Sequence, residues 1–441
     1  MVTETLSVYY HGFEAAVMSY DNDKNLAYFE YTPEFVATGM QLSPLKMPLV
    51  AKKVYQFPQL NPATFKGLAG LVADSLPDKF GTSVLNQWLA QQGRTRPISV
   101  FERLQYTGTR GMGALEFRPT KQLKNLNASQ TINLEFLTEL AQSVVNNRKN
   151  LNVSLANNTI DTESMKSLLA VGTSAGGARP KAVLAFNHDF SQVRSGQVDA
   201  PKGFNHFIMK FDGVSEHNKN EETFGDPLGY GTMEYVYYLM AKSCGIDMQD
   251  CHLLDEGPRR HFITKRFDRQ GNHKIHIQTL TGIDHVDYNT PGSYSYEELF
   301  TVARKLKLPL HDAKQLFLRM VFNHVARNND DHSKNFSFIF QDNTWRLSPA
   351  YDVAYCYKPN NLWVERHWMS ANGKRIGHMR ADLIAVGANV TKLPHSLMHE
   401  MIDAVLDAVS QWDQLAKQHE VPKQLRQEIN QQLALKDYKK S

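Results

Sequence analysis

The stretch over residues 321–352 constrains this chain more than any other. Asp330 is followed five residues later by Asn335, and Asp352 comes seventeen residues after that. An amphipathic helical pattern leads into Asp330, and FSFIF, which is typical of a strand, separates Asn335 from Asp352. We expect WRLS at 345–348 to pair with FSFIF across a turn at Asp342-Asn343, and this hairpin would bring Asp352 back near Asn335. Phosphoryl-transfer enzymes need one carboxylate to accept a hydroxyl proton, and an amide plus a second carboxylate to hold Mg²⁺. The spacing therefore predicts a phosphotransferase with Asp330, Asn335 and Asp352 as catalytic residues.

Two departures from the protein-kinase pattern weaken this signal when it is taken alone. Asp-x4-Asn has the spacing of the kinase catalytic loop, but Asn328 and Asn329 replace the His and Arg that usually precede the Asp. Asp352 stands in SPAYD and lacks the glycine of a DFG motif. Because Asp and Asn also gather in turns, the prediction depends on finding a nucleotide site upstream.

A glycine- and serine-rich turn is the first candidate for that site. Residues 168–190 hold two apolar segments around GTSAGGARP. Such a turn exposes backbone N–H groups that can point at phosphate oxygens, and Arg179 and Lys181 add positive charge beside it. A flexible hairpin tip explains the same composition, so this turn alone does not decide between the two.

A strand lysine and a helix glutamate are the next candidates. Lys210 lies inside the apolar strand HFIMKFD, where a lysine is costly unless it is paired or meets an anion. Glu234 stands in the first turn of a helix predicted over 232–245, and we hypothesise that it pairs with Lys210. An edge-strand lysine and a favourable helix-dipole position explain these residues equally well. HFITKRFDRQGN at 261–272 is a strand whose end has the position of an adenine-binding hinge.

His332 raises a different possibility, a metal-dependent hydrolase. It stands beside Asp330 and Asp331, but a second histidine with ligand spacing is missing nearby, since His324 lies eight residues earlier on the helix. A role in orienting the loop or touching a phosphate is the favoured interpretation.

The composition is that of a soluble globular protein with two or three lobes, at 441 residues and 42% hydrophobic content. A net charge of +4 permits an anionic partner without demanding one. The cysteines, Cys244, Cys251 and Cys356, form no zinc pattern, which favours a reducing compartment. The N-terminus shows no secretory signal and no apolar run reaches ~18 residues. We therefore expect a cytoplasmic protein without membrane contact.

Several motifs together resemble one family, the HipA family of bacterial toxin kinases. They are GTSAGGARPKAVL, HFIMKFD, EYVYYLMAK, ITKRFDR, NDDHSKNFSF and LSPAYDV, together with LPDKFG at 76–81 and MSANGKRIGHMRADLIAVG at 369–387. The resemblance implies an α+β, two-lobed protein-kinase-like fold. It has an N-terminal β-rich subdomain (1–120), an α/β nucleotide lobe with the phosphate loop (121–268) and an all-α C-terminal lobe with the catalytic loop (269–441).

The resemblance also implies roles for individual residues. Asp330 resembles the catalytic base, and Asn335 and Asp352 resemble the ligands of the metal, Mg²⁺. The residues that resemble an ATP-binding set are Gly176, Gly177, Ala178, Arg179, Pro180, Lys181, Lys210, Lys265, Arg266, Phe267, His332 and Tyr351.

Ser174 resembles the serine that family members autophosphorylate, which expels the loop and stops activity. A phosphate there adds ~−2 charge beside the ATP phosphates, so self-inactivation is physically reasonable. Two positions depart from the family pattern: Lys265 stands where the hinge often carries Glu, and Arg179-Pro180 replaces Gln-Glu in the loop.

The implied function is a serine/threonine protein kinase that acts as the toxin of a toxin–antitoxin pair. Its expected substrate is a cytosolic protein of the aminoacyl-tRNA synthetase class. Its expected partner is a HipB-like helix-turn-helix antitoxin, with operator DNA bound mainly through that partner. Direct DNA contact by Lys374, Arg375 or Arg380 is less favoured than an ordinary solvated turn. Two alternatives stay open: a small-molecule kinase, and a catalytically weak corepressor that clamps a DNA-bound partner.

Overall fold

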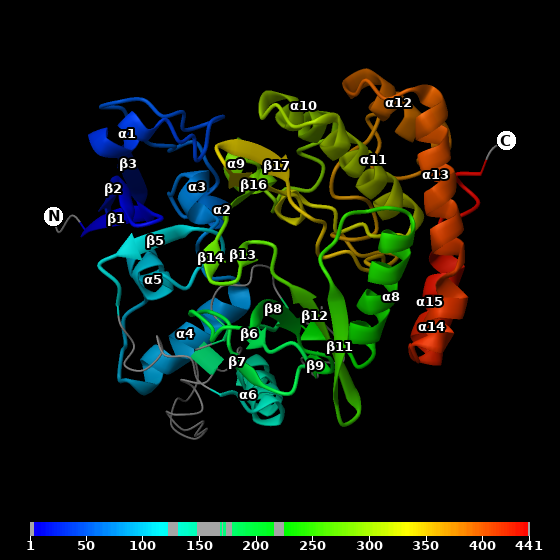
Figure 1. Cartoon of the computed structure of the whole chain (residues 1–441), viewed down its shortest axis with the longest axis horizontal. Helices are drawn as coiled ribbons and strands as arrows, with labels where there is room; N and C mark the ends of the chain where they lie inside the picture. The colour runs from blue at the N-terminus through cyan, green and yellow to red at the C-terminus, as the bar shows by residue number, and fades with distance from the viewer. Residues whose placement is uncertain are drawn as a thin grey trace.

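The computed structural model describes residues 4–121, 131–147, 168–169, 171–172, 179–215 and 225–439. Two antiparallel sheets, formed by the first third and the middle of the chain, lie beside a block of helices from the C-terminal part (Figure 1). The predicted two-lobed α+β arrangement is confirmed. Among the described helices, none combines the length and the apolar content that crossing a lipid bilayer requires.

The N-terminal sheet has the strand order β4-β3-β2-β1-β5. Its strands are β1 (Glu4–Tyr10), β2 (Phe13–Asp21), β3 (Leu26–Tyr31), β4 (Val54–Tyr55) and β5 (Leu115–Arg118). Buried and accessible residues alternate along much of β1, as expected for a sheet with one face on a core. The helices of this region are α1 (Pro33–Thr38), α2 (Pro62–Phe65), α3 (Gly70–Ala73), α4 (Lys79–Gln91) and α5 (Val100–Thr107).

The middle sheet has the order β11-β12-β8-β6-β7, and all its pairs are antiparallel. Its strands are β6 (Lys181–Phe186), β7 (Val193–Ser195), β8 (Asn205–Lys210), β11 (Cys251–Glu256) and β12 (Arg259–Lys265). Two short ribbons pair β9 (Val214–Ser215) with β10 (Gly225–Asp226), and β13 (Arg269–Gln270) with β14 (His273–Lys274).

Helices flank this middle sheet. The helix α8 (Tyr230–Ser243) packs on β11 and β12, close to the predicted range of 232–245. The helices α4 and α6 (Leu134–Asn147) share one apolar cluster with β6 and β8. Every residue of β6 is buried, which a strand covered on both faces explains.

The C-terminal lobe is mainly helical. Its helices are α9 (Leu280–Asp284), α10 (Tyr296–Lys305), α11 (Leu310–Val325), α12 (Arg380–Val390), α13 (His395–Ser410), α14 (Trp412–Gln418) and α15 (Lys423–Gln432). Ser295 and Glu298 form a capping box at the start of α10.

The expectation of an all-α C-terminal lobe is too narrow. This lobe also contains a sheet of β15 (His276–Thr279), β16 (Ser337–Gln341) and β17 (Thr344–Leu347). The predicted pairing of FSFIF with WRLS across Asp342-Asn343 is confirmed as β16–β17. Both turn residues have positive φ, 50° and 57°, which suits a tight hairpin. The strand β15 was not predicted, and it pairs with β16.

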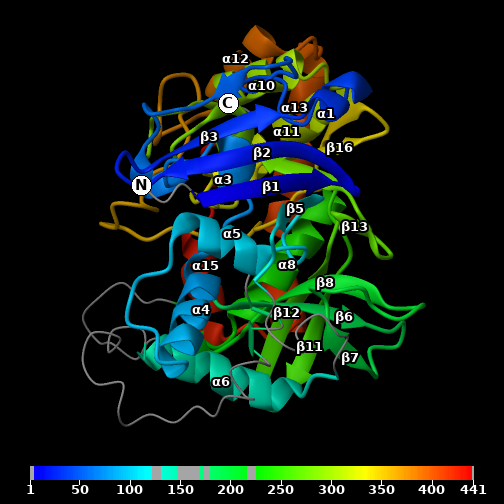
Figure 2. The same ribbon diagram turned by 90° about the vertical axis from the view of Figure 1, so that its left-hand side faces the viewer.

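The N-terminal region docks on the C-terminal lobe through two glycines. A Cβ atom added at Gly70 of α3 would lie 2.2 Å from Gly282 O of α9, and one added at Gly282 would lie 2.1 Å from Asp74 Oδ2. Asp74 Oδ2 accepts a 2.8 Å hydrogen bond from Thr279 N in this contact. One apolar cluster then continues from the N-terminal sheet into the C-terminal helices. Figure 2 shows the N-terminal strands on this side of the molecule, above the middle sheet.

Candidate active site

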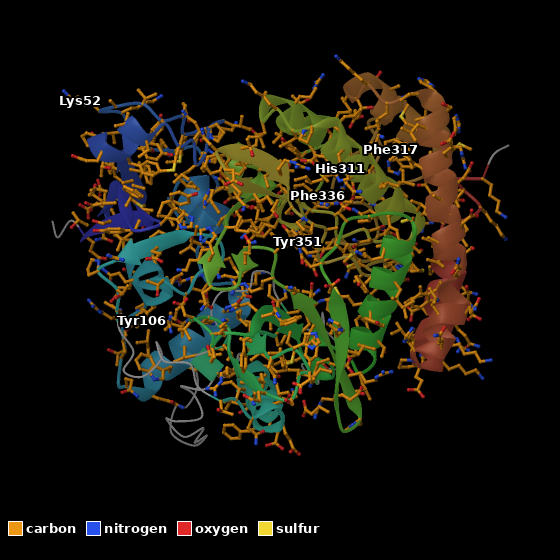
Figure 3. The ribbon with its side chains drawn as sticks, in the orientation of Figure 1. Lys52, Tyr106, His311, Phe317, Phe336 and Tyr351 are labelled. Carbon is orange, nitrogen blue, oxygen red and sulfur yellow. The ribbon has the colours of Figure 1, made fainter. Side chains whose placement is uncertain are left out.

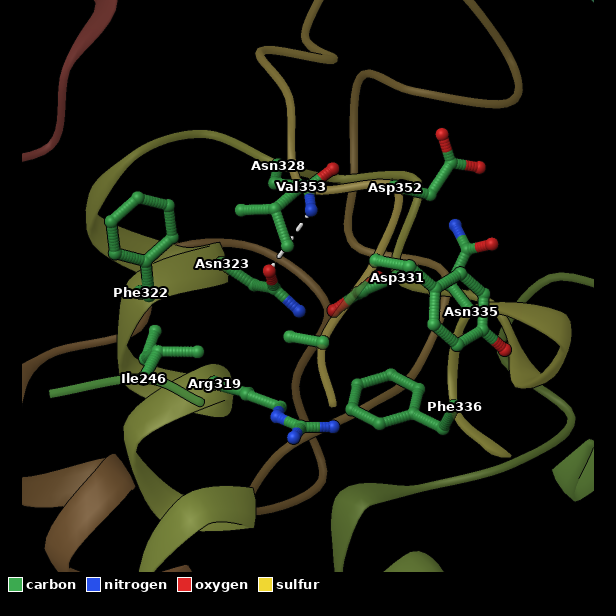
Figure 4. Close-up of a pocket in the computed structure, with 12 residues that line it drawn as sticks. Ile246, Arg319, Phe322, Asn323, Asn328, Asp331, Asn335, Phe336, Asp352 and Val353 are labelled. Carbon is green, nitrogen blue, oxygen red and sulfur yellow. Dashed lines mark hydrogen bonds between the residues drawn. The ribbon is translucent and has the colours of Figure 1, made fainter. Parts of the chain in front are cut away.

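The helix α11 delivers the predicted catalytic loop. It is buried along almost its whole length and ends at Ala326. Arg327 follows with φ of 57°, which turns the chain out of the helix. Asn328 Nδ2 then donates to Asn323 Oδ1 at 3.0 Å (dashed in Figure 4), and Asn329 Nδ2 donates to two main-chain carbonyls at 3.1 and 3.2 Å. The two asparagines in place of His and Arg therefore anchor the loop.

Asp330 and Asn335 are held in one short turn. Asn335 Nδ2 donates to the main-chain carbonyl of Asp330 at 2.8 Å, which directs its Oδ1 away from that carbonyl. The Asp330 side chain is 42% exposed, so a hydroxyl group can reach it. Burial raises the pKa of Asp330, His332 opposes the rise and Asp352 adds to it. A carboxylate with a raised pKa is a stronger base than an ordinary aspartate.

Lys210 links the middle sheet to this loop. Its Nζ lies 2.5 Å from Glu234 Oε1 and 2.5 Å from Asp352 Oδ1. Only 6% of Lys210 is exposed, so the hypothesised Lys210–Glu234 pair is confirmed and buried. Burial alone would lower the pKa of Lys210, but Asp352 and Glu234 outweigh it and raise that pKa. The reciprocal effect, with Lys210 and Lys181 outweighing burial, holds the pKa of Asp352 well below its usual range.

A second buried lysine lies beside the first. Lys181 on β6 is opposite Lys210 on β8 in the strand register. Burial lowers the pKa of Lys181, and Lys210 lowers it further while Asp352 opposes the change. Arg179, two residues earlier, adds positive potential at Asp330 and Asp352. Lys181, Lys210 and Arg179 therefore place positive charge near Asp330 and Asp352, the predicted catalytic carboxylates.

The remaining residues of the predicted phosphate loop are not all described. Thr173, Ser174, Gly176, Gly177 and Ala178 lie outside the described residues. After these residues, the main-chain carbonyl of Pro180 accepts a hydrogen bond from Phe211 N, and this bond joins the end of the turn to the end of β8.

The three residues of the predicted adenine-binding hinge, 265–267, make different contacts. Lys265 N donates to Asp250 O at 2.9 Å, and Arg266 N donates to His206 O at 2.8 Å, so both groups serve the protein's own backbone. The Arg266 guanidinium forms two bonds to Asp268, at 2.8 and 2.7 Å, and does not face a ligand site. Phe267, the last residue of the predicted hinge, is half-buried.

Phe267 and Tyr351 bring two rings together between the lobes. Their centroids lie 5.7 Å apart, and Tyr351 Oη donates to Lys334 O at 2.6 Å. Figure 3 places Tyr351 near the centre of the molecule. This pair offers flat apolar surface of the kind that a nucleobase stacks on.

His332 packs between aromatic residues. Its ring centroid lies 5.9 Å from that of Tyr288 and 6.4 Å from that of Trp368, and its Nε2 is 3.7 Å from Asp330 Oδ1. This placement fits the expected role of orienting the loop.

Asp78 also lies near the predicted site, and no sequence pattern identified it as a site residue. It caps α4 by accepting a 2.6 Å bond from Gly81 N. Burial raises its pKa to about 6, although the backbone of Gly81, Lys181 and Lys334 all oppose the rise. Its place in LPDKFG, just before a helix, was a recognisable N-cap signal, but sequence spacing gives no sign that it faces Lys181.

Asn335 and Asp352 line the same pocket, together with Tyr351 and Asp331. Figure 4 shows the Asn335 amide and the Asp352 carboxylate on the same side of this pocket. Lys210 occupies Oδ1 of Asp352, and the hydrogen bond to Asp330 fixes the Asn335 amide. One carboxylate and one amide oxygen form the donor set that Mg²⁺ prefers, so these residues fit the metal.

Family comparisons agree with this geometry. The HipA N-terminal domain matches residues 6–118, and the HipA-like C-terminal domain matches residues 173–412, which is more than half of the chain. This chain belongs to the HipA family. Its N-terminal family domain contains the sheet β1–β5, and its C-terminal family domain contains every described site residue except Asp78.

Individual relatives of this HipA chain are distant. Toxin YjjJ of Escherichia coli is 25% identical over 199 residues, which cover 44% of this chain and 41% of that protein. A candidate kinase of Sinorhizobium fredii, Y4mE, is 27% identical over 135 residues, covering 28% of this chain and 32% of that protein. The chain thus matches less than half the length of these two curated relatives.

A solved structure of the same family matches almost the whole HipA chain. It is the Shewanella oneidensis HipA, HipB and operator DNA complex, with a TM-score of 0.65 and 16% identity, covering 97% of this chain and 95% of that one. This likeness shows the two-lobed kinase-like fold.

The basic segment 374–380 is solvated at Lys374 and at positions 376, 377 and 379, as expected, but its two arginines make contacts within the protein. Lys374 Nζ contacts Asp382 Oδ1 at 2.8 Å, and Arg375 Nε donates to His367 O at 2.7 Å. Arg380 is buried and donates to a main-chain carbonyl near the C-terminus. These side chains hold the lobe together.

Proposed function

We propose that this HipA-family chain is an ATP-dependent serine/threonine protein kinase that acts as the toxin of a toxin–antitoxin pair. The observation that carries the proposal is the Lys210 bridge, in which one buried ammonium contacts Glu234 and Asp352. Active protein kinases require a strand lysine paired with a helix glutamate, and a metal-binding aspartate beside it. Here all three groups meet next to Asp330.

In this proposal, Asp330 accepts the proton of the substrate hydroxyl as its oxygen attacks the terminal phosphorus of ATP. ADP leaves, and the phosphoryl group passes to the substrate. The raised pKa of Asp330 suits a general base, and its partial exposure admits a protein side chain. His332 and Asn335 hold the loop so that this carboxylate keeps its direction.

The nucleotide would lie between the lobes. Lys181, Lys210 and Arg179 would bind phosphate oxygens, and Phe267 with Tyr351 would flank the base. Mg²⁺, held by Asn335 and Asp352, supplies charge neutralisation at the phosphates. Lys210 also keeps Asp352 facing the site from the opposite lobe.

Autophosphorylation of Ser174 is the regulatory part of the proposal. The serine lies five residues before Arg179, whose charge acts on both catalytic carboxylates. A phosphate on Ser174 would place negative charge where the ATP phosphates bind and would stop catalysis.

The Shewanella complex of HipA, HipB and operator DNA supports the proposed partner, and the proposed substrate rests on the family resemblance alone. We propose an aminoacyl-tRNA synthetase as the substrate class. We also propose a HipB-like helix-turn-helix antitoxin that binds the operator. The contacts that Arg375 and Arg380 make within the protein favour DNA contact through the antitoxin.

The proposal is tested by incubating the chain with labelled ATP and Mg²⁺, alone and with a panel of purified aminoacyl-tRNA synthetases. The variants are wild type, Asp330→Ala and the exposed-site control Asp23→Ala. Mass spectrometry then examines the 171–181 peptide and the synthetases. We expect label on Ser174 and on one synthetase with wild type and control, and none with Asp330→Ala.

Other outcomes favour the alternatives. Transfer of label to an aminoglycoside or inositol, with none to protein, would identify a small-molecule kinase. Wild-type chain that neither binds ATP nor becomes labelled, yet still supports operator binding by its partner, would identify a corepressor.

A further inference from the structure

Three buried histidines meet behind the catalytic loop and take no part in the proposed function. His324 comes from α11, and His367 and His378 come from the segment between β17 and α12. One ring nitrogen of each lies within 4.8 Å of those of the other two. The three residues are 0%, 3% and 4% exposed, respectively.

In each histidine the other ring nitrogen already has a hydrogen-bond partner. His324 Nδ1 is 2.8 Å from Met320 O, and His378 Nε2 is 3.0 Å from Lys374 O. His367 Nδ1 is 2.9 Å from Asp331 Oδ2. Main-chain carbonyls and a carboxylate only accept, so each of these nitrogens carries the proton.

The second nitrogen of His324 therefore carries a lone pair directed into the protein, whereas the backbone of Ala371 also interacts with His378. His324 Nε2 is fully buried and has no hydrogen-bond partner among the described residues. The rings stay neutral, so protonation does not satisfy the unpaired nitrogen. Burial lowers the pKa of His324 and of His367 well below the usual value, and repulsion from the other histidines lowers it further. An unsatisfied buried nitrogen is costly unless a cation or donor meets it.

We propose that His324, His367 and His378 bind a zinc ion with a structural role. Neutral imidazole nitrogens are preferred zinc ligands, and three of them leave one tetrahedral position for a water. Asp331 orients His367 from its far nitrogen, as carboxylates orient zinc-bound histidines in many sites. Arg327 and Arg375 add positive potential at His367, so Asp331 is the group that offsets the charge of the ion.

Binding requires a small rotation of the rings. The His324 and His367 rings are stacked with centroids 3.9 Å apart, and His378 meets His324 edge-on at 4.4 Å. Tetrahedral zinc with bonds of about 2.0–2.1 Å would place its nitrogen ligands roughly 3.3 Å apart. Rotation about the side-chain torsions supplies this change without moving α11.

The ion would connect three elements that support the catalytic centre. It would tie the end of α11 to the segment 367–378, and through Asp331 it would reach the residue next to Asp330. Asp331 also accepts bonds from Tyr296 Oη and from Trp368 N, both at 2.7 Å. The metal would thus stabilise the loop that positions Asp330, without contacting substrate.

The test measures zinc by mass spectrometry in the full-length chain after zinc loading and gel filtration. We expect about one zinc per chain in wild type and in the exposed-histidine control His395→Ala, and at least a tenfold loss in His367→Ala and His378→Ala. Cobalt(II) loaded into wild type should give the intense visible absorption of a tetrahedral site.

Thermal unfolding of the wild-type chain tests the proposal even if the histidine variants do not fold. A chelator should lower the wild-type Tm by about 5 °C or more, and zinc should restore it. The proposal would be overturned if the folded wild-type chain held no stoichiometric zinc and its Tm did not change on adding a chelator or zinc. Zinc retained by both His367→Ala and His378→Ala would overturn it too, because the ion would then lie elsewhere.

Discussion

Lys210 on β8 and Asp352 after β17 form a partly buried ion pair across 142 residues of sequence, with Nζ and Oδ1 2.5 Å apart. Asp352 has φ of 55°, so the chain adopts a left-handed conformation where its carboxylate meets the lysine. The pair joins the middle sheet to the C-terminal lobe. In the proposed function, this one contact would couple phosphate binding by Lys210 to metal binding by Asp352.

Replacing Lys210 with methionine should remove activity and reduce stability. Glu234 and Asp352 would lose their shared cation in a buried setting, which costs about 3 kcal/mol. Urea unfolding should report this loss, and titration calorimetry should show much weaker ATP binding. Lys202→Met, at an exposed position, is the control and should match wild type in both measurements. A Lys210→Met chain with unchanged stability would show that the bridge is not formed in solution.

Replacing Asp352 with asparagine should make nucleotide binding insensitive to Mg²⁺. The amide keeps the size of the side chain but loses the negative charge that attracts the metal. Wild type should bind ATP more tightly with Mg²⁺ than with a chelator, by about tenfold or more, whereas the variant should show little difference. An Asp352→Asn chain that keeps the full Mg²⁺ effect would assign the metal to other residues.

Asp78→Asn should stabilise the protein at neutral pH. The pKa of Asp78 is raised to about 6 in the folded chain, so the folded state binds this proton more tightly than the unfolded state does. Its contribution to stability is present at low pH and is lost as the pH rises through 6. Asparagine keeps the helix cap without ionising, so the variant should gain about 1–3 kcal/mol at pH 8 and nothing at pH 3.5. Urea unfolding at pH 8 and at pH 3.5 measures the gain in the free energy of unfolding. An equal gain at the two pH values would contradict the raised pKa of Asp78.

Gly282→Ala should loosen the docking of the N-terminal region. The new methyl group would overlap Asp74 Oδ2 and approach Gly70 O, both in the α3–α9 contact. We expect a loss of about 2–4 kcal/mol in the free energy of unfolding. Lys305→Ala, exposed on α10, is the control. Equal stability of the two variants would contradict the close packing described here.

The kinase analogy and the turn residues predicted two of the contacts. The pairing of a strand lysine with a helix glutamate in protein kinases suggested that Lys210 meets Glu234. The turn residues Asp342-Asn343 predicted the hairpin that returns Asp352 toward Asn335.

Contacts made by irregular segments were not predictable in this way. His324 was considered with His332, eight residues away, whereas its partners are His367 and His378, which a long loop brings to it. Arg266 was assigned to ATP through its backbone at the hinge, and no sequence pattern indicated that its side chain turns inward to Asp268, the carboxylate partner that a buried guanidinium needs. The placement of Asp78 near Lys181 depends on domain docking, which no local pattern encodes.

The most direct test of the central claim compares wild type with Asp330→Asn in two measurements on the same samples, ATP affinity with Mg²⁺ and the rate of phosphoryl transfer. Asparagine preserves the shape of the loop but cannot accept the proton. We predict unchanged ATP affinity and a rate lower by about 10²–10⁴-fold. A variant that transfers phosphate at the wild-type rate would contradict the assignment of Asp330 as the catalytic base.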